Sequence, residues 1–118
     1  MSTEPTVFER IVAREIPADI VFENERLLAI TDIAPQAPVH LLVFPKEATY
    51  RNVAELAAGD PQLLAEIVGT ARSLAEQHAD GHFRLVFNTG ENAGQTVFHV
   101  HAHVLAGDTQ AEGSLGHL

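Results

Sequence analysis

The chain has 118 residues, of which 46% are hydrophobic and 19% charged, and a formal net charge of −9, a composition typical of one globular domain with a modest core. The negative charge disfavours binding to nucleic acid, because the phosphates would be repelled, and the lack of cysteine excludes disulfides and thiolate metal sites. The first residues lack the pattern of a secretory signal, and no apolar run reaches the roughly 18 residues of a membrane span, so we expect a cytoplasmic protein without a membrane partner.

The N-terminal half of the sequence predicts a short helix followed by three strands. Thr6 and Glu9 have the spacing of a capping box at a helix start, and Pro17 is expected to close that helix. A two-residue connection separates the first two β-like runs and indicates a hairpin. A proline-containing loop at 33–40 then leads to a compact buried strand. The predicted strands cover residues 19–23, 26–32 and 40–45.

The C-terminal half of the sequence predicts one long helix and two more strands. Asp60 before Pro61 is typical of a helix N-cap followed by proline at the first helical position. Apolar residues then keep helical spacing to about His78. A glycine-bounded loop at 90–94 joins the last two strands. These strands are predicted at residues 83–89 and 97–105.

This order of elements predicts an α+β domain. We expect a five-stranded, mainly antiparallel sheet, with a short N-terminal helix and one long helix on one side of it. The domain would span residues 1–118, with residues 108–118 forming a C-terminal tail.

Three histidines lie in the predicted last strand: His99, His101 and His103. Successive side chains of a strand point to opposite faces, so these three would share one face. The other face would be apolar and would carry Phe98, Val100, Ala102 and Val104. The core would then be complete without the histidines, and we expect them to have a chemical role.

The residues alone leave three interpretations of this histidine face open: a polar exposed surface, a metal site, or a catalytic site. His-x-His pairs on strands bind zinc or copper, but the nearest carboxylates, Glu91 and Asp108, lie outside the strand. For catalysis, imidazole titrates near pH ~6.5, so one neutral histidine can attack through a ring nitrogen while a protonated neighbour stabilises an anion.

The loop before the last strand has the composition of an anion site. Residues 85–107 contain no lysine or arginine, so histidine and backbone N–H groups would have to bind a phosphate. Gly94 would let a backbone amide approach an anion closely. Asn88, Gln95 and Thr96 offer neutral donors, although Asn and Gly are also the residues of an ordinary hairpin turn.

The segment HVHAHVL matches the motif His-φ-His-φ-His-φ-φ, with φ apolar, and the chain resembles the histidine-triad (HIT) family and its Hint branch. Further similar segments, which cover most of the chain, are TVFERIVAREIP, DIAPQAPVHLLVFPK and RLVFNTGENAGQTVFHVHAHVLAG. The resemblance implies the HIT fold and hydrolysis of the P–N bond of purine nucleoside 5′-phosphoramidates, with AMP- or GMP-type substrates and no cofactor or metal. It also implies a homodimer, for which we expect helix 61–78 and strand 83–89 at the interface.

The resemblance implies a role for each candidate site residue. His101 would attack the α-phosphorus and carry the nucleoside monophosphate covalently, His103 would contact the phosphate oxygens, and His99 and His40 would complete the cluster. Asp32 would accept hydrogen bonds from the ribose hydroxyls. The base pocket would be lined by Val7, Phe8, Ile11, Ile30, Thr31 and Ile33. The phosphate would be held by Asn88, Gly94, Gln95 and Thr96, and Thr96 would assist the departing amine.

Two positions depart from the family pattern. Ala48 stands where many animal relatives have a histidine, which argues against a proton relay through that position, and Ala106-Gly107 replaces a frequent Gly-Gly. These features resemble bacterial members. The alternatives are a dinucleoside polyphosphate hydrolase of the Fhit-like branch, a nucleotide-binding module with little catalysis, and a zinc-binding protein. The Fhit-like branch tends to have Leu-Pro-Arg after its last histidine, whereas this chain has Leu105-Ala106-Gly107.

Overall fold

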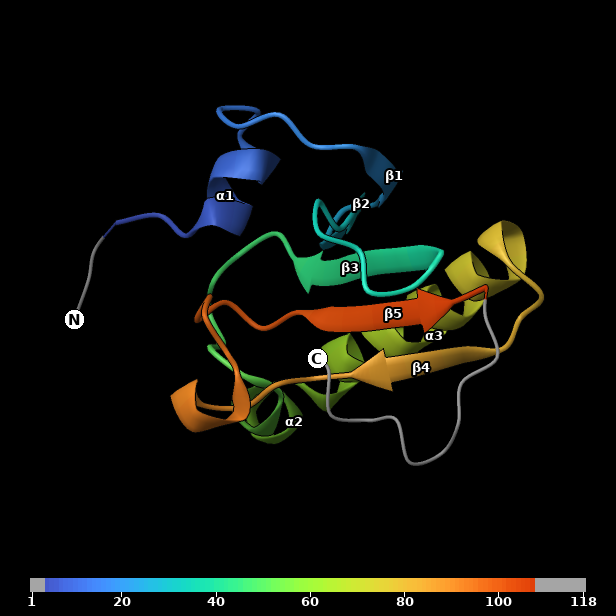
Figure 1. Ribbon diagram of the computed structural model, residues 1–118. Coiled ribbons are helices and arrows are strands. Elements are labelled where there is room, and N and C mark those ends of the chain that lie inside the picture. The colour runs from blue at the N-terminus through green and yellow to red at the C-terminus, as the bar shows by residue number, and fades with distance from the viewer. Residues whose placement is uncertain (1–3, 108–118) are drawn as a thin grey trace.

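The computed structural model describes residues 4–107 (Figure 1), and the predicted tail at 108–118 lies outside the described residues. The elements in chain order are α1 (Val7–Val12), β1 (Ile20–Glu23), β2 (Leu27–Thr31), β3 (Val39–Pro45), α2 (Val53–Gly59), α3 (Pro61–His78), β4 (Phe83–Val86), the short 3-10 helix η1 (Glu91–Ala93) and β5 (Ala102–Ala106). The strands form a five-stranded sheet in the order β1-β2-β3-β5-β4, with every neighbouring pair antiparallel. The predicted α+β fold with a five-stranded antiparallel sheet is confirmed.

The helix-start signals of the sequence act as predicted, but the expected helix end is wrong: α1 ends at Val12, with Arg14 at a positive φ of 63°, and does not continue to Pro17. Thr6 caps α1: its hydroxyl accepts the Glu9 N–H at 3.1 Å, and the Glu9 carboxylate accepts the Thr6 N–H at 3.0 Å. Asp60 caps α3 by accepting the Leu63 N–H at 3.0 Å. A six-residue helix is too short to be stable in isolation, so α1 depends on the packing of its buried side chains, Phe8 and Ile11.

The sheet has an apolar cluster on each face, because side chains alternate along β2 and β3. One cluster packs against α2 and α3, which lie behind β3, β5 and β4 in Figure 1; its members include Leu27, Ala29, Leu41, Val43, Ile67, Val100, Ala102 and Val104. The other packs against α1 and contains Phe8, Ile11, Leu28, Ile30, Leu42 and Phe44. The prediction that the helices lie on one side is therefore wrong, because the apolar side chains of α1 cover the second face.

Helix α2 is an element that the sequence patterns did not indicate. Asn52 caps it by accepting the Glu55 N–H at 2.9 Å, and its Leu56 is fully buried against the α3 side of the sheet. The Asn52–Glu55 spacing is itself a cap-like signal. Neither α2 nor α3, nor any other helix in residues 4–107, is both long and apolar enough to cross a membrane.

The last two strands are shorter than predicted. β4 ends at Val86, and β5 begins only at Ala102, so His99 and His101 precede the strand. Pairing between β3 and β5 stops at Val43↔Ala102. Beyond that pair, the carbonyl of Pro45 lies 2.6 Å from the His99 ring, and the Val100 N–H donates to the Tyr50 carbonyl at 3.0 Å. These bonds replace the strand ladder in the segment that leads into β5.

Candidate active site

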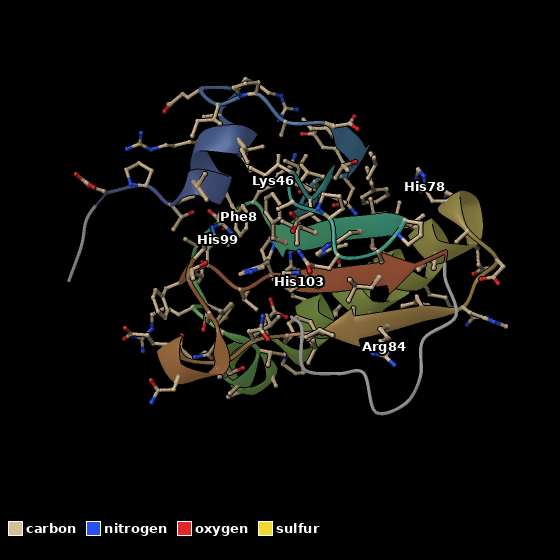
Figure 2. The ribbon with its side chains drawn as sticks, in the orientation of Figure 1. Phe8, Lys46, His78, Arg84, His99 and His103 are labelled. Atoms are coloured by element: carbon tan, nitrogen blue, oxygen red, sulfur yellow. The ribbon has the colours of Figure 1, made fainter. Side chains whose placement is uncertain are left out.

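Four histidines gather on the α1 face of the sheet. His40 of β3 and His103 of β5 have ring centroids 5.2 Å apart, and His101 lies 5.2 Å from His103. The ring of Phe8 makes T-shaped contacts with the rings of His99 and His101, at centroid distances of 5.4 Å and 4.9 Å. Figure 2 shows Phe8 and His99 close together beneath α1, with His103 further along on β5. The structure thus brings together all four histidines named from the sequence.

The simple alternation expected for residues 98–104 is only partly correct. Val100, Ala102 and Val104 are buried in the cluster against α3, but Phe98 is 47% exposed and does not belong to the core. His99 in turn is fully buried. The pattern fails because this segment bends away from β3 before Ala102, so a strict two-residue period no longer applies there.

His99 has a hydrogen-bond partner on each ring nitrogen. Its Nε2 lies 2.6 Å from the Pro45 carbonyl oxygen, which can only accept, so Nε2 carries a hydrogen and donates. Its Nδ1 lies 2.7 Å from the Thr6 hydroxyl. Burial lowers the pKa of His99, so the ring is neutral at neutral pH and Nδ1 accepts from the Thr6 O–H.

His101 is oriented by the main chain of its neighbour. Its Nδ1 lies 2.8 Å from the His99 carbonyl oxygen, so Nδ1–H is the donor. Burial also lowers the pKa of His101, against a smaller opposing effect of that hydrogen bond. A neutral ring with its hydrogen on Nδ1 has a lone pair on Nε2. The structure therefore defines which nitrogen of His101 is available as a nucleophile.

His40 and His103 form a second directed pair. The Gln36 N–H donates to His40 Nδ1 at 3.0 Å, which leaves the hydrogen of neutral His40 on Nε2. That Nε2 lies 3.0 Å from His103 Nδ1 and 3.4 Å from a carboxylate oxygen of Asp32. His40 thus donates toward His103, and neutral His103 carries its own hydrogen on Nε2.

The pKa values of the four histidines are all lowered, and burial is the largest cause in each case. The pKa of His103 falls to about 4, because burial is reinforced by the nearby His101 and His40 and is opposed only by Asp32. The pKa of His40 is lowered by burial and raised by Asp32. The sequence led us to expect one protonated histidine, whereas the direction of all four shifts favours neutral rings that act as oriented N–H donors.

Asp32, His40 and His103 also hold atoms close enough to ligate a cation, within 4.8 Å of one another. Metal ligation by His40 through Nε2 would require the hydrogen on Nδ1, but the Gln36 N–H already points at Nδ1. The main chain thus selects the tautomer that donates toward His103. This arrangement favours a hydrogen-bond relay over a metal centre.

The residues expected at the nucleoside fall into two groups. Phe8 and Ile11 are 5% exposed and belong to the cluster beneath α1, where Phe8 stacks on Phe44 at 4.3 Å. Ile33, by contrast, is 99% exposed. Asp32, the residue before it, holds the Ala34 N–H at 2.8 Å through one carboxylate oxygen and faces His40 with the other. An exposed apolar side chain beside a carboxylate that faces the histidines suits a nucleoside-binding edge.

The residues expected at the phosphate differ in burial and in how many of their donors are already hydrogen-bonded, and Gln95 is the most constrained of them. Gln95 is buried, with its carbonyl oxygen accepting the Gly90 N–H at 2.9 Å and its amide donating to the carbonyls of Arg51 at 2.6 Å and Val97 at 3.0 Å. Both amide hydrogens are in use, so the prediction of Gln95 as a side-chain donor to phosphate is wrong. Its side chain instead stabilises the loop before His99 through these three hydrogen bonds.

The other three residues expected at the phosphate differ in what they can still donate. Gly94 is exposed with a positive φ of 95°, but its N–H already donates to the Glu91 carbonyl at 3.1 Å. Asn88 is half-buried in the chain that follows β4. Thr96 is exposed and lines a hollow of about 720 Å³ together with Thr6, Ala48 and Phe98, among others. The sequence did not indicate the roles of Thr6 and the Pro45 carbonyl, because these groups lie 93 and 54 residues from His99. The Gln36 N–H is only four residues from His40, but no pattern in the sequence marks that contact.

The chain is similar to known proteins over most of its length. The family model described as "Scavenger mRNA decapping enzyme C-term binding" matches residues 5–116. An uncharacterized HIT-like protein of Synechococcus elongatus is 46% identical over 111 residues, covering 92% of this chain and 96% of that protein. The purine nucleoside phosphoramidase of Escherichia coli is 40% identical over 106 residues, covering 88% of each chain.

A solved structure, the HIT family hydrolase from Clostridium thermocellum, superposes with a TM-score of 0.88 at 43% sequence identity. The match covers 97% of this chain and all of that one. The likeness therefore extends over the whole fold and is not limited to the histidine motif.

Proposed function

This chain belongs to the histidine-triad (HIT) family of hydrolases, and we propose that it hydrolyses the P–N bond of purine nucleoside 5′-phosphoramidates through a covalent nucleotidyl-histidine. The observation that carries this proposal is the bond from His101 Nδ1–H to the His99 carbonyl at 2.8 Å, which leaves the lone pair of the neutral ring on Nε2. The name of the E. coli relative supports the choice of substrate.

In the first proposed step, His101 Nε2 attacks the α-phosphorus. The new N–P bond forms as the P–N bond to the leaving amine breaks, and the bonding electron pair goes to the amine nitrogen, which takes a proton from the solvent side. The ring then carries a positive charge and keeps its hydrogen on Nδ1. The His99 carbonyl at 2.8 Å stabilises that charge.

In the second step, water attacks the phosphorus and the bond to His101 Nε2 breaks, with its electron pair returning to the ring. The attacking water loses a proton to solvent, and the nucleoside monophosphate leaves. The ring is again neutral and ready for another substrate. Splitting one difficult displacement into two easier ones is the general benefit of a covalent intermediate.

The phosphate oxygens would be bound by oriented N–H groups. His103 presents its Nε2–H because its Nδ1 accepts from His40. The exposed Thr96 hydroxyl would add a further donor, whereas the N–H groups of Gly94 and Gln95 already donate to the carbonyls of Glu91 and Gly90 at 3.1 Å. Asp32 would accept hydrogen bonds from the ribose hydroxyls, and Ile33 would contact the base.

The experiment measures AMP release from an adenosine 5′-phosphoramidate with chelator present. We expect turnover by the natural chain and a loss of about 10³-fold or more in His101→Ala, the order of effect seen when a nucleophile is removed. His82→Ala is the matched control, because that histidine is 92% exposed beyond α3. Full activity in His101→Ala, or loss of activity on adding chelator, would overturn the mechanism. Preferred turnover of diadenosine polyphosphate would favour the Fhit-like alternative.

We further propose a homodimer formed through α3 and β4. β4 is an edge strand of the sheet, and Val68 on α3 is 40% exposed. An edge strand and an exposed apolar side chain are features that a second copy can cover. Sedimentation at micromolar concentration tests this, and a monomeric mass would contradict it.

A further inference from the structure

We propose that Thr6, at the start of α1, is a positioning residue for the nucleophile and acts on His101 through His99. The kinetic part of this inference rests on the proposed function, whereas its structural part does not. Thr6 is 93 residues from His99 in sequence, and its hydroxyl lies 2.7 Å from His99 Nδ1.

The Thr6 hydroxyl is a hydrogen-bond acceptor for one partner and a donor to another. It accepts the Glu9 N–H at 3.1 Å as the N-cap of α1, and it donates to His99 Nδ1. The direction of the second bond follows from the Pro45 carbonyl, which requires the hydrogen of the neutral ring on Nε2. The side chain at position 6 must therefore be both an acceptor and a donor.

His99 transmits the position of Thr6 to the nucleophile. Its ring is fully buried and held at both nitrogens, and its own carbonyl accepts from His101 Nδ1 at 2.8 Å. Phe8, from the same helix, packs against both rings. Because residues 97–101 lie outside β5, the bonds of the His99 ring help to fix that carbonyl.

The loss of the Thr6 donor would have a defined local consequence. It would leave an unpaired nitrogen in a fully buried ring, which is unfavourable and favours a new ring position. Among the described residues, no buried side-chain nitrogen or oxygen lacks a partner, so this defect would be new. A shift of the His99 carbonyl would then turn the His101 ring away from its attacking direction.

Three substitutions separate the histidine bond from the helix cap. Thr6→Ser keeps both the cap and the donor. Thr6→Asp keeps a good N-cap, but an ionised carboxylate cannot donate to a bare nitrogen. Thr6→Val loses both functions. Glu9→Ala is the matched control. It removes the carboxylate that accepts the Thr6 N–H, but it keeps the hydrogen bond between the Thr6 hydroxyl and the His99 ring.

The test combines turnover of an adenosine 5′-phosphoramidate with ¹⁵N NMR of the histidine rings. We expect Thr6→Ser and Glu9→Ala to stay within about two-fold of the natural kcat. Thr6→Asp and Thr6→Val should lose about ten-fold in kcat with a smaller change in KM, less than the roughly 100-fold that a 1 Å misplacement can cost. The ring signals of His99 and His101 should change in the Asp and Val variants alone.

Unchanged His101 signals and natural kcat in Thr6→Asp would overturn the positioning role. An equal loss in Glu9→Ala would also overturn it, because the effect would then come from the cap. If the natural chain releases no AMP, the proposed function fails, and the NMR comparison still decides whether Thr6 controls the two rings.

Discussion

The two faces of the sheet are built from the same strands but are held together differently. On the face toward α2 and α3, Leu41 and Val43 of β3 meet the long helix in an apolar cluster. On the face toward α1, the alternate positions of β3 carry His40, Leu42 and Phe44, and a six-residue helix covers part of the surface. One face therefore depends on buried area, and the other on directed hydrogen bonds around the histidines.

Because the two faces share β3, a single strand contributes both to stability and to the candidate site. Substitutions on the α3 face should change the free energy of unfolding and leave the kinetics of the folded protein unchanged. Substitutions on the α1 face should change both quantities or only the kinetics.

Ile67→Ala should be the most destabilising of these changes. Ile67 is fully buried on α3, and truncation of such a side chain costs about 2–5 kcal/mol through lost burial and a residual cavity. Urea denaturation measures the loss of stability. The kcat of the remaining folded protein should equal that of the natural chain. Gln77→Ala, on the exposed side of the same helix, should stay within about 0.5 kcal/mol. A large fall in kcat for Ile67→Ala would mean that the two faces are coupled.

Phe8→Leu should affect both properties. Phe8 stacks on Phe44 and contacts the rings of His99 and His101. We expect a loss of about 1 kcal/mol in stability, because aromatic pairs contribute about 0.5–1.5 kcal/mol beyond burial, together with a lower kcat. Denaturation and steady-state kinetics check the two parts. Natural kcat in this variant would show that α1 does not position the histidines.

Acid should weaken the α1 face. The pKa of His103 falls from its usual value of 6.5 to about 4 in the folded protein, mainly because of burial. Between these values the unfolded state binds more protons than the folded state, so stability rises with pH across this window. The contribution is complete above pH 6.5 and is lost as the pH falls toward 4.

Denaturation at a series of pH values measures this effect. The stability of His103→Asn should depend less on pH between 4 and 6.5 than that of the natural chain. His82→Asn is the control and should leave the dependence unchanged, since that side chain is 92% exposed. Identical pH profiles for the natural chain and His103→Asn would contradict the assignment.

Ile33→Ser should have the smallest effect on stability. The side chain is 99% exposed, so the free energy of unfolding should change by less than about 0.5 kcal/mol. If Ile33 contacts the base, KM for an adenosine phosphoramidate should rise by about ten-fold, the lower end of the effect of one lost apolar contact. An unchanged KM would remove Ile33 from the nucleoside site.

Short-range signals account for the parts of the fold that the sequence predicted well. The capping box of Thr6 and Glu9, and the Asp60-Pro61 start of α3, each act within four residues. The extent of the last strand was predicted poorly, because it depends on how far β3 can pair with it. The Pro45 carbonyl bonds the His99 ring, and the strand therefore begins later, at Ala102.

The candidate site divides in the same way. The residue types of the candidate site could be read from the sequence, namely His40, His99, His101, His103 and Asp32. The tautomers of His101 and His40 depend on main-chain groups only two and four residues away, the His99 carbonyl and the Gln36 N–H. The tautomer of His99 and the contact between His40 and His103 required the tertiary structure, because the Thr6 hydroxyl, the Pro45 carbonyl and the two histidine strands come from segments that meet only when the sheet and α1 are assembled.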